Sequence, residues 1–149
     1  MPRGKKVENM AEKKVIDIAD FFTTSREKEG VWYEPKIEDV GIGIEFKILG
    51  YSSDQNVISA EVYRKEHEEA EKETDPVKKN NMERDAVCKR IASLVTDIRG
   101  KDGNEIRIGG KPLSYSEEVV REILYENIDI RTDLFKATLE TPNFQMKKR

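Results

Sequence analysis

One histidine and one cysteine are the chain's only residues of those types. A serine or cysteine nucleophile needs a neighbouring base such as histidine, and His67 lies inside the charged run from Arg64 to Asp75, where we expect it to face solvent. Structural zinc takes about four Cys or His ligands, which this chain cannot supply. Cys88 falls within an apolar helical pattern that predicts a buried thiol. We therefore predict neither a nucleophile nor a metal site.

Stretches that approach ligand-binding motifs fail at essential positions. Lys111 follows two glycines as in a phosphate loop, but the sequence has Glu105 and Pro112 where that loop needs a glycine and a Ser or Thr. A partial dinucleotide fingerprint has Phe46 in place of its third glycine, and residues 97–109 lack carboxylates that a calcium loop requires. No carboxylate lies in an apolar stretch that would raise its pKa. The sequence thus predicts a non-enzymatic protein without a cofactor.

Length and composition limit the classes of protein to which this chain could belong. The 149 residues suit one domain, and the 27 basic and 30 acidic side chains leave a net charge of −3, which does not favour nucleic acid as a partner. No apolar run approaches the ~20 residues needed to cross a bilayer, and the unpaired cysteine suits a reducing cytoplasm. We predict a flexible basic arm over residues 1–14, a single domain over 15–145 and a basic tail over 146–149.

The N-terminal half of this domain carries the strand patterns. Residues 31–33 and 41–48 are expected to form strands, because the apolar side chains in the second stretch alternate with Gly43, Glu45 and Lys47. Residues 105–108 form another short strand that could join the same antiparallel sheet. The apolar stretch from Val15 to Phe22 is expected to dock on the core.

Helical patterns fill most of the remaining chain. A helix capped within Ser52–Asp54 should pack only through its first turns, with Val57, Ile58 and Val62, because the helical segment over 64–81 is strongly charged and breaks near Asp75 and Pro76. A second helix is predicted from Met82 to Arg99, with Gly100 as its C-terminal cap.

Two further helices are predicted near the C-terminus. One is capped by Ser114 or Ser116, with Ser114 and Glu117 at capping-box spacing, and the last runs from about Ile130 to Glu140 before Pro142. The predicted fold class is α+β and mostly α, with a small antiparallel sheet packed against about four helices. Partner-binding side chains are proposed among the large apolar residues that also fit an ordinary core: Trp32, Leu113, Tyr115, Phe135 and Phe144.

Several short motifs occur together in this chain. They are Gly30-Val31-Trp32-Tyr33, Ser52-Ser53-Asp54, Asp97-Ile98-Arg99-Gly100, Gly110-Lys111-Pro112-Leu113-Ser114-Tyr115-Ser116 and Asn143-Phe144. In this order, over roughly residues 15–145, they resemble the tail assembly chaperones and related small tail proteins of long-tailed phages. The resemblance implies a non-enzymatic factor of the bacterial host cytoplasm that binds the tape-measure and tail-tube proteins, keeps them soluble and leaves before the tail is finished.

Other classes of protein fit the same sequence. A structural tail or head-completion subunit would remain in the virion, and an adaptor would use the basic tails on nucleic acid. The long charged segment over 64–81 departs from the family pattern and could alter the choice of partner. Exposed strand edges or the last two helices are the expected partner surfaces. Self-association into a homo-oligomer stays open.

Overall fold

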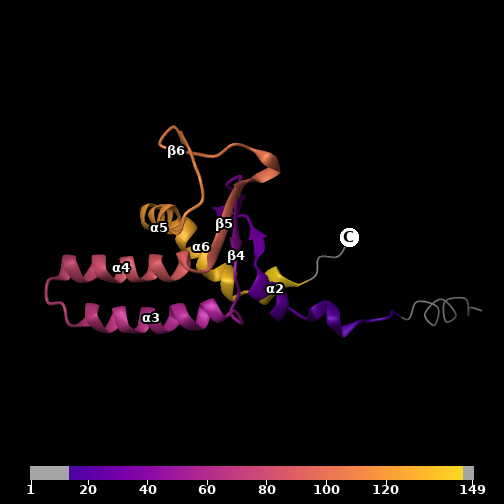
Figure 1. The fold of residues 1–149 in the computed structure, drawn as a ribbon, viewed down its shortest axis with the longest axis horizontal. Helices are drawn as coiled ribbons and strands as arrows, with labels where there is room; N and C mark the ends of the chain where they lie inside the picture. Colours follow the sequence, from indigo (N-terminus) through magenta and orange to yellow (C-terminus); the bar gives the residue numbers. More distant parts are fainter. Residues whose placement is uncertain (1–13, 146–149) are drawn as a thin grey trace, which may run out of the picture.

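A computed structural model describes residues 14–145 of the chain. All but the last residue of the predicted N-terminal arm (1–14), and the whole predicted C-terminal tail (146–149), lie outside the described residues. A small sheet and its covering helices form the body of the molecule, and a long two-helix hairpin projects from one side of it (Figure 1). The fold is α+β and mostly α, which confirms the predicted class.

The central sheet contains three antiparallel strands. β1 (Val31–Tyr33) and β5 (Val95–Gly100) pair with opposite edges of β4 (Ile44–Ile48). Phe46 and Ile48 of the central strand are 1% and 0% exposed, as the alternating pattern requires. The strand predicted at 31–33 is therefore confirmed, and the one predicted at 41–48 is confirmed over residues 44–48, because Gly41 belongs to a separate short strand.

The helix predicted from Met82 to Arg99 is wrong in its C-terminal part. α4 (Pro76–Ala92) ends first, and the chain then enters β5. The apolar stripe that includes Val95 and Ile98 fits either structure locally, but pairing with β4 supplies strand hydrogen bonds that local sequence cannot reveal. Gly100 is the last residue of β5 instead of a helix cap, and a Cβ there would collide with the carbonyl oxygen of Asn104.

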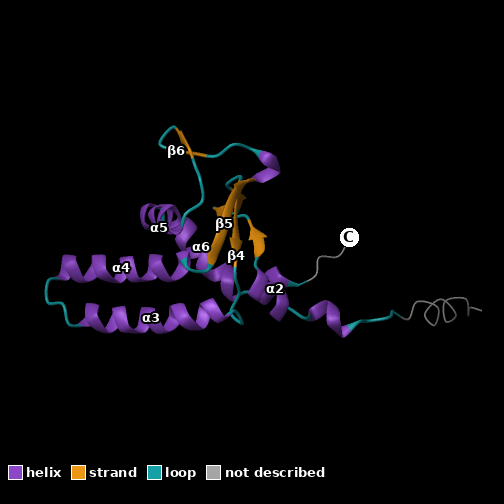
Figure 2. Cartoon of the chain, viewed as in Figure 1, coloured by secondary structure: helices purple, strands orange, loops and turns teal. Residues whose placement is uncertain are grey.

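The projecting hairpin consists of α3 (Asp54–Glu71) and α4, joined by a short connection (Figure 2). The Ser53 hydroxyl accepts a hydrogen bond from the Asn56 N–H, and the Asp75 carboxylate accepts one from the Val77 N–H. Pro76 follows as the first residue of α4, where its missing N–H costs no helical hydrogen bond. The predicted cap and the predicted break are confirmed.

Packing in the hairpin extends beyond the first turns of α3. Ala70, near the far end of that helix, is fully buried, whereas Val57 and Ile58 are 68% and 56% exposed. The prediction that only the first turns pack, through their apolar side chains, is wrong. It failed because small residues let two helices approach closely even in a charged segment.

The predicted strand at 105–108 does not join the central sheet. Its last two residues form β6 (Arg107–Ile108), which pairs with β7 (Lys111–Pro112) in a separate hairpin. Gly109 and Gly110 make the turn with φ of 56° and 85°, a conformation that suits glycine. A second small hairpin joins β2 (Lys36–Ile37) to β3 (Val40–Gly41).

The C-terminal helices complete the core. α5 (Glu117–Glu126) is capped by Ser116, so the alternative cap at Ser114 and its capping box are wrong. α6 (Ile128–Leu139) and the 3-10 turn η3 (Thr141–Phe144) follow. Their side chains pack with those of α4 and the sheet in one apolar cluster, whose fully buried members include Ile48, Val120, Leu124, Leu134 and Phe144.

Candidate functional site

The residues from Val15 to Phe22, here called the N-terminal apolar segment, lie largely in solvent. They include the 3-10 turn η1 (Ile18–Phe21), which is capped by Asp17. Five of their large apolar side chains are between 50% and 97% exposed: Val15, Ile16, Ile18, Phe21 and Phe22. The prediction that this stretch docks on the core is wrong. Exposed apolar side chains gathered in one segment are typical of a surface that contacts a partner.

The base of this segment is fixed to the domain by a buried carboxylate. Glu27, in α2 (Thr24–Glu29), is 2% exposed. Its oxygens accept hydrogen bonds from the Thr23 hydroxyl at 2.7 Å and from the Ser52 N–H at 3.0 Å. The backbone N–H of Gly50 also donates to the Glu27 carbonyl at 2.9 Å. The chain is thus held in place immediately after the exposed side chains end.

A second contact ties this base to the C-terminal turn. Nη1 of Arg26 donates to the carbonyl oxygen of Phe22 at 2.7 Å and to that of Phe144 at 3.1 Å. The Phe144 side chain is fully buried in the core. In this conformation Phe144 therefore supports the base of the segment and offers no side-chain surface to a partner.

The other aromatic residues predicted to bind a partner lie on different elements. Trp32, on the edge strand β1, is half-buried, and the guanidinium of Arg99 lies 3.9 Å from the centre of its ring. Phe135, on α6, packs against the core, and the guanidinium of Arg90 lies 5.4 Å from its ring centre. Each ring already contacts an arginine of this chain, so only the rest of its surface is available to a partner.

Leu113 and Tyr115 lie in the segment that leads from β7 into α5. Leu113 packs against the core, and its N–H donates to the carbonyl oxygen of Ile106 at 3.0 Å. The Tyr115 hydroxyl donates to the carbonyl oxygen of Val95 at 2.9 Å, and burial raises the pKa of this phenol. Tyr115 reaches the start of β5 whereas Trp32 lies beside its end, so the predicted contact residues do not form a single patch.

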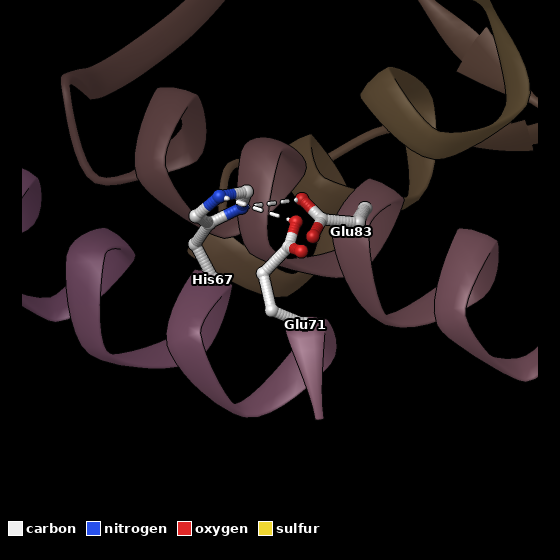
Figure 3. A group of neighbouring side chains, drawn as sticks. All are labelled: His67, Glu71 and Glu83. Atoms are coloured by element: carbon white, nitrogen blue, oxygen red, sulfur yellow. Dashed lines mark hydrogen bonds and ion pairs between the residues drawn. The ribbon is translucent and has the colours of Figure 1, made fainter. Parts of the chain in front are cut away.

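The only histidine forms a cluster with two glutamates in the helical hairpin (Figure 3). His67 and Glu71 stand one turn apart on α3, and Glu83 comes from the facing side of α4. His67 Nδ1 lies 2.9 Å from Glu83 Oε2, and His67 Nε2 lies 3.5 Å from Glu71 Oε1. The His67 side chain is 43% exposed, so it faces solvent in part as expected, but both of its ring nitrogens also contact carboxylates.

Charge in this cluster favours a protonated imidazole. The hydrogen bond with Glu83 raises the pKa of His67 above its ordinary value of 6.5, and the negative charges of both glutamates act in the same direction. Burial of the imidazole and the positive charge of Lys79, whose Nζ lies 3.5 Å from Glu71 Oε2, act against this rise. The Tyr63 ring stacks on the imidazole with ring centres 5.9 Å apart. His67 therefore faces carboxylates and an aromatic ring, an arrangement that holds a cation better than it activates a nucleophile.

Cys88 is buried on α4, as predicted from the apolar pattern. Burial raises the pKa of its thiol, and this effect outweighs the nearby Arg131, whose Nη1 lies 3.9 Å from the sulfur. A thiol that stays protonated is a poor nucleophile and a poor metal ligand. Cys88 therefore acts as part of the core.

Part of the histidine cluster was open to prediction from the sequence. The spacing of four between His67 and Glu71 places both on one face of a helix. Glu83 lies 16 residues beyond His67, and only the break at Asp75 and Pro76 brings it back to the same place. Combining the predicted break with an antiparallel return of the chain would have indicated the full set of three side chains.

Comparison of the chain with protein-family models, with curated protein sequences and with solved structures finds no match. Among the described residues, no helix combines the length and the apolar character needed to span a membrane.

Proposed function

We propose that this protein is a non-enzymatic tail assembly chaperone, which binds the tape-measure and tail-tube proteins while a phage tail is built in the bacterial cytoplasm. The resemblance of the short motifs over residues 15–145 supports this class of function. The observation that carries the proposal is the solvent exposure of the N-terminal apolar segment, because a chaperone of this kind must cover apolar surface on an unassembled partner.

Two aromatic side chains of this segment are the proposed anchors. Phe21 and Phe22 are 50% and 62% exposed, and each can bury a large area of ring surface on a partner. Burial of apolar surface is worth roughly 25 cal/mol per Å², and a few aromatic side chains commonly dominate the affinity of an interface. The segment would therefore bind through a small number of strong contacts.

The charged residues of the segment indicate what kind of surface it would bind on a partner. Asp17 and Asp20 alternate with the apolar side chains and keep the free segment compatible with water. On the tape-measure protein, the complementary surface would be an apolar strip flanked by lysine or arginine. The buried Glu27 holds the base of the segment, so binding orders few additional residues.

The proposal is tested by purifying the tagged full-length chain from cells in which phage tails are assembling. Mass spectrometry of the complex is expected to identify the tape-measure or tail-tube protein. The double substitution Phe21→Ser with Phe22→Ser should reduce the captured tape-measure protein by about tenfold or more. Its melting temperature should match that of the wild type, because neither ring belongs to the buried core.

A matched control substitutes exposed apolar side chains elsewhere. Val57 and Val77, on the hairpin, are 68% and 70% exposed, and their replacement by serine should leave capture unchanged. Unchanged capture by the Phe21/Phe22 variant, or a complex containing neither tail protein, would contradict the proposal. Finished particles should lack this chain, and its presence there would identify a structural subunit instead.

A further inference from the structure

We propose that His67, Glu71 and Glu83 form a binding site for a divalent transition-metal ion of the zinc type, which bridges the two helices of the hairpin. One nitrogen and two carboxylate oxygens, each from a different side chain, lie within 4.8 Å of one another. Small side-chain movements would bring them to the donor distances of about 2.0–2.2 Å that zinc requires. This inference concerns a site separate from the N-terminal apolar segment and does not depend on the proposed function.

The donor types select the class of ion. Imidazole nitrogen binds zinc, copper, nickel and iron well, whereas calcium and magnesium prefer sites made of oxygen alone. One histidine with two carboxylates is a donor set that zinc accepts when water completes the coordination. The two negative carboxylates of Glu71 and Glu83 also balance the two positive charges of the ion, whereas a neutral histidine ligand brings no negative charge.

A second observation also indicates a missing positive group. Oε2 of Glu83 contacts the histidine, but Oε1 of the same carboxylate is buried and has no hydrogen-bond partner among the described residues. A buried carboxylate oxygen without a donor is costly. A metal ion bound by both oxygens of this carboxylate would give Oε1 the partner that it lacks. Figure 3 shows both glutamates turned toward the imidazole ring from their two helices.

Binding must displace the interactions that the cluster makes without metal. The imidazole would lose a proton to free one ring nitrogen for the ion, and Glu71 would exchange its contact with Lys79 for the metal. The ion would then join α3 to α4 in the far half of the hairpin. Metal concentration would thereby set the stability of this half of the hairpin, where Lys79 and Glu71 form an exposed ion pair between the two helices.

The test uses the untagged full-length chain, titrated with zinc chloride by calorimetry. One ion per chain is expected, and zinc about 100-fold above the dissociation constant should raise the melting temperature by about 5 °C or more. A chelator should reverse this shift. Cobalt chloride should give the visible absorption of a four- or five-coordinate cobalt ion with nitrogen and oxygen ligands. Magnesium chloride should neither bind in the calorimeter nor raise the melting temperature.

Variants of His67 and Glu83 test whether zinc binds at this cluster. His67→Asn and Glu83→Gln should each weaken zinc binding by about tenfold or more, because each removes a ligand while retaining similar size. Glu68→Gln is the matched control, since Glu68 is an exposed neighbour on α3 that pairs with Arg64. Absence of one-to-one binding, or equal affinity in the His67→Asn variant, would overturn the proposal. Weaker binding in all variants including the control would also overturn it.

Discussion

In the body of the molecule, which holds the sheet, Phe46, Ile48 and Leu134 are at most 1% exposed, and apolar contacts from several elements enclose them. In the far half of the hairpin, here residues 61–83, several of the side-chain contacts are ion pairs whose members are between 39% and 74% exposed. Apolar burial contributes far more per residue than exposed ion pairs do. Global stability should therefore be set in the body, while salt, pH and bound ions should act on the hairpin.

The largest effect should come from a cavity in the core. Leu134→Ala removes a fully buried side chain and should lower the free energy of unfolding by roughly 2–5 kcal/mol. Urea denaturation followed by far-ultraviolet circular dichroism measures this loss. Val77→Ala, at a position that is 70% exposed on the hairpin, is the control and should change stability by less than about 0.5 kcal/mol. Equal losses in both variants would remove the distinction between the two regions.

A smaller effect is expected at the junction of the two regions. Ser53 caps α3 through the Asn56 N–H at 3.1 Å, and its hydroxyl donates to the carbonyl oxygen of Gly50 at 2.7 Å. Ser53→Ala should lower the free energy of unfolding by about 1 kcal/mol, as loss of a helix cap does. The same denaturation experiment measures it. Ser52→Ala is the control because Ser52 uses only its backbone N–H in this turn, and a loss as large in that variant would argue against the cap.

The smallest expected effect on stability is that of His67 protonation. It should be confined to the hairpin and depend on pH. The pKa of His67 is raised, chiefly by its hydrogen bond with Glu83, so protonation stabilises the folded hairpin. This contribution is complete below the unfolded value of about 6.5 and is lost as pH rises through the higher folded value. A proton NMR titration measures the pKa of this histidine, with a chelator present to remove metal ions. No other histidine signal has to be distinguished, because the chain has only one.

Substitution of the carboxylate sharpens this test. In Glu83→Gln the titration midpoint of His67 should fall toward 6.5, while Glu71 still raises it and Lys79 still lowers it. Glu68→Gln should leave the midpoint close to that of the wild type, because Glu68 pairs with Arg64. A midpoint that is the same in wild type and Glu83→Gln would show that the contact does not persist in solution.

Local signals allowed much of the fold to be predicted. The alternation around Phe46 indicated its strand, and the cap at Ser53 and the break at Pro76 are set by neighbouring residues. β5 was missed because the stripe that contains Val95 and Ile98 continues a helical period, and only a distant partner strand makes it extended. Pairing across the sheet is not encoded within the segment itself.

The candidate sites were less open to prediction than the fold. Composition shows that the stretch from Val15 to Phe22 is apolar, but it does not show whether the core has space left to receive it. Phe144 and the C-terminal helices fill the core, so the earlier segment remains outside. Glu83 joins His67 only through the antiparallel return of α4, a relation that no local pattern contains.

The contact between Trp32 and Arg99 has a practical consequence. Arg99 also donates to Glu45 at 2.8 Å, so one guanidinium links the edge strands β1 and β5 across β4. Trp32 is the only tryptophan in the chain. Its fluorescence therefore reports on the integrity of the three-stranded sheet, from which the hairpin that carries the histidine cluster projects (Figure 1). Without any added label, an optical signal follows the sheet while the histidine resonance follows the hairpin.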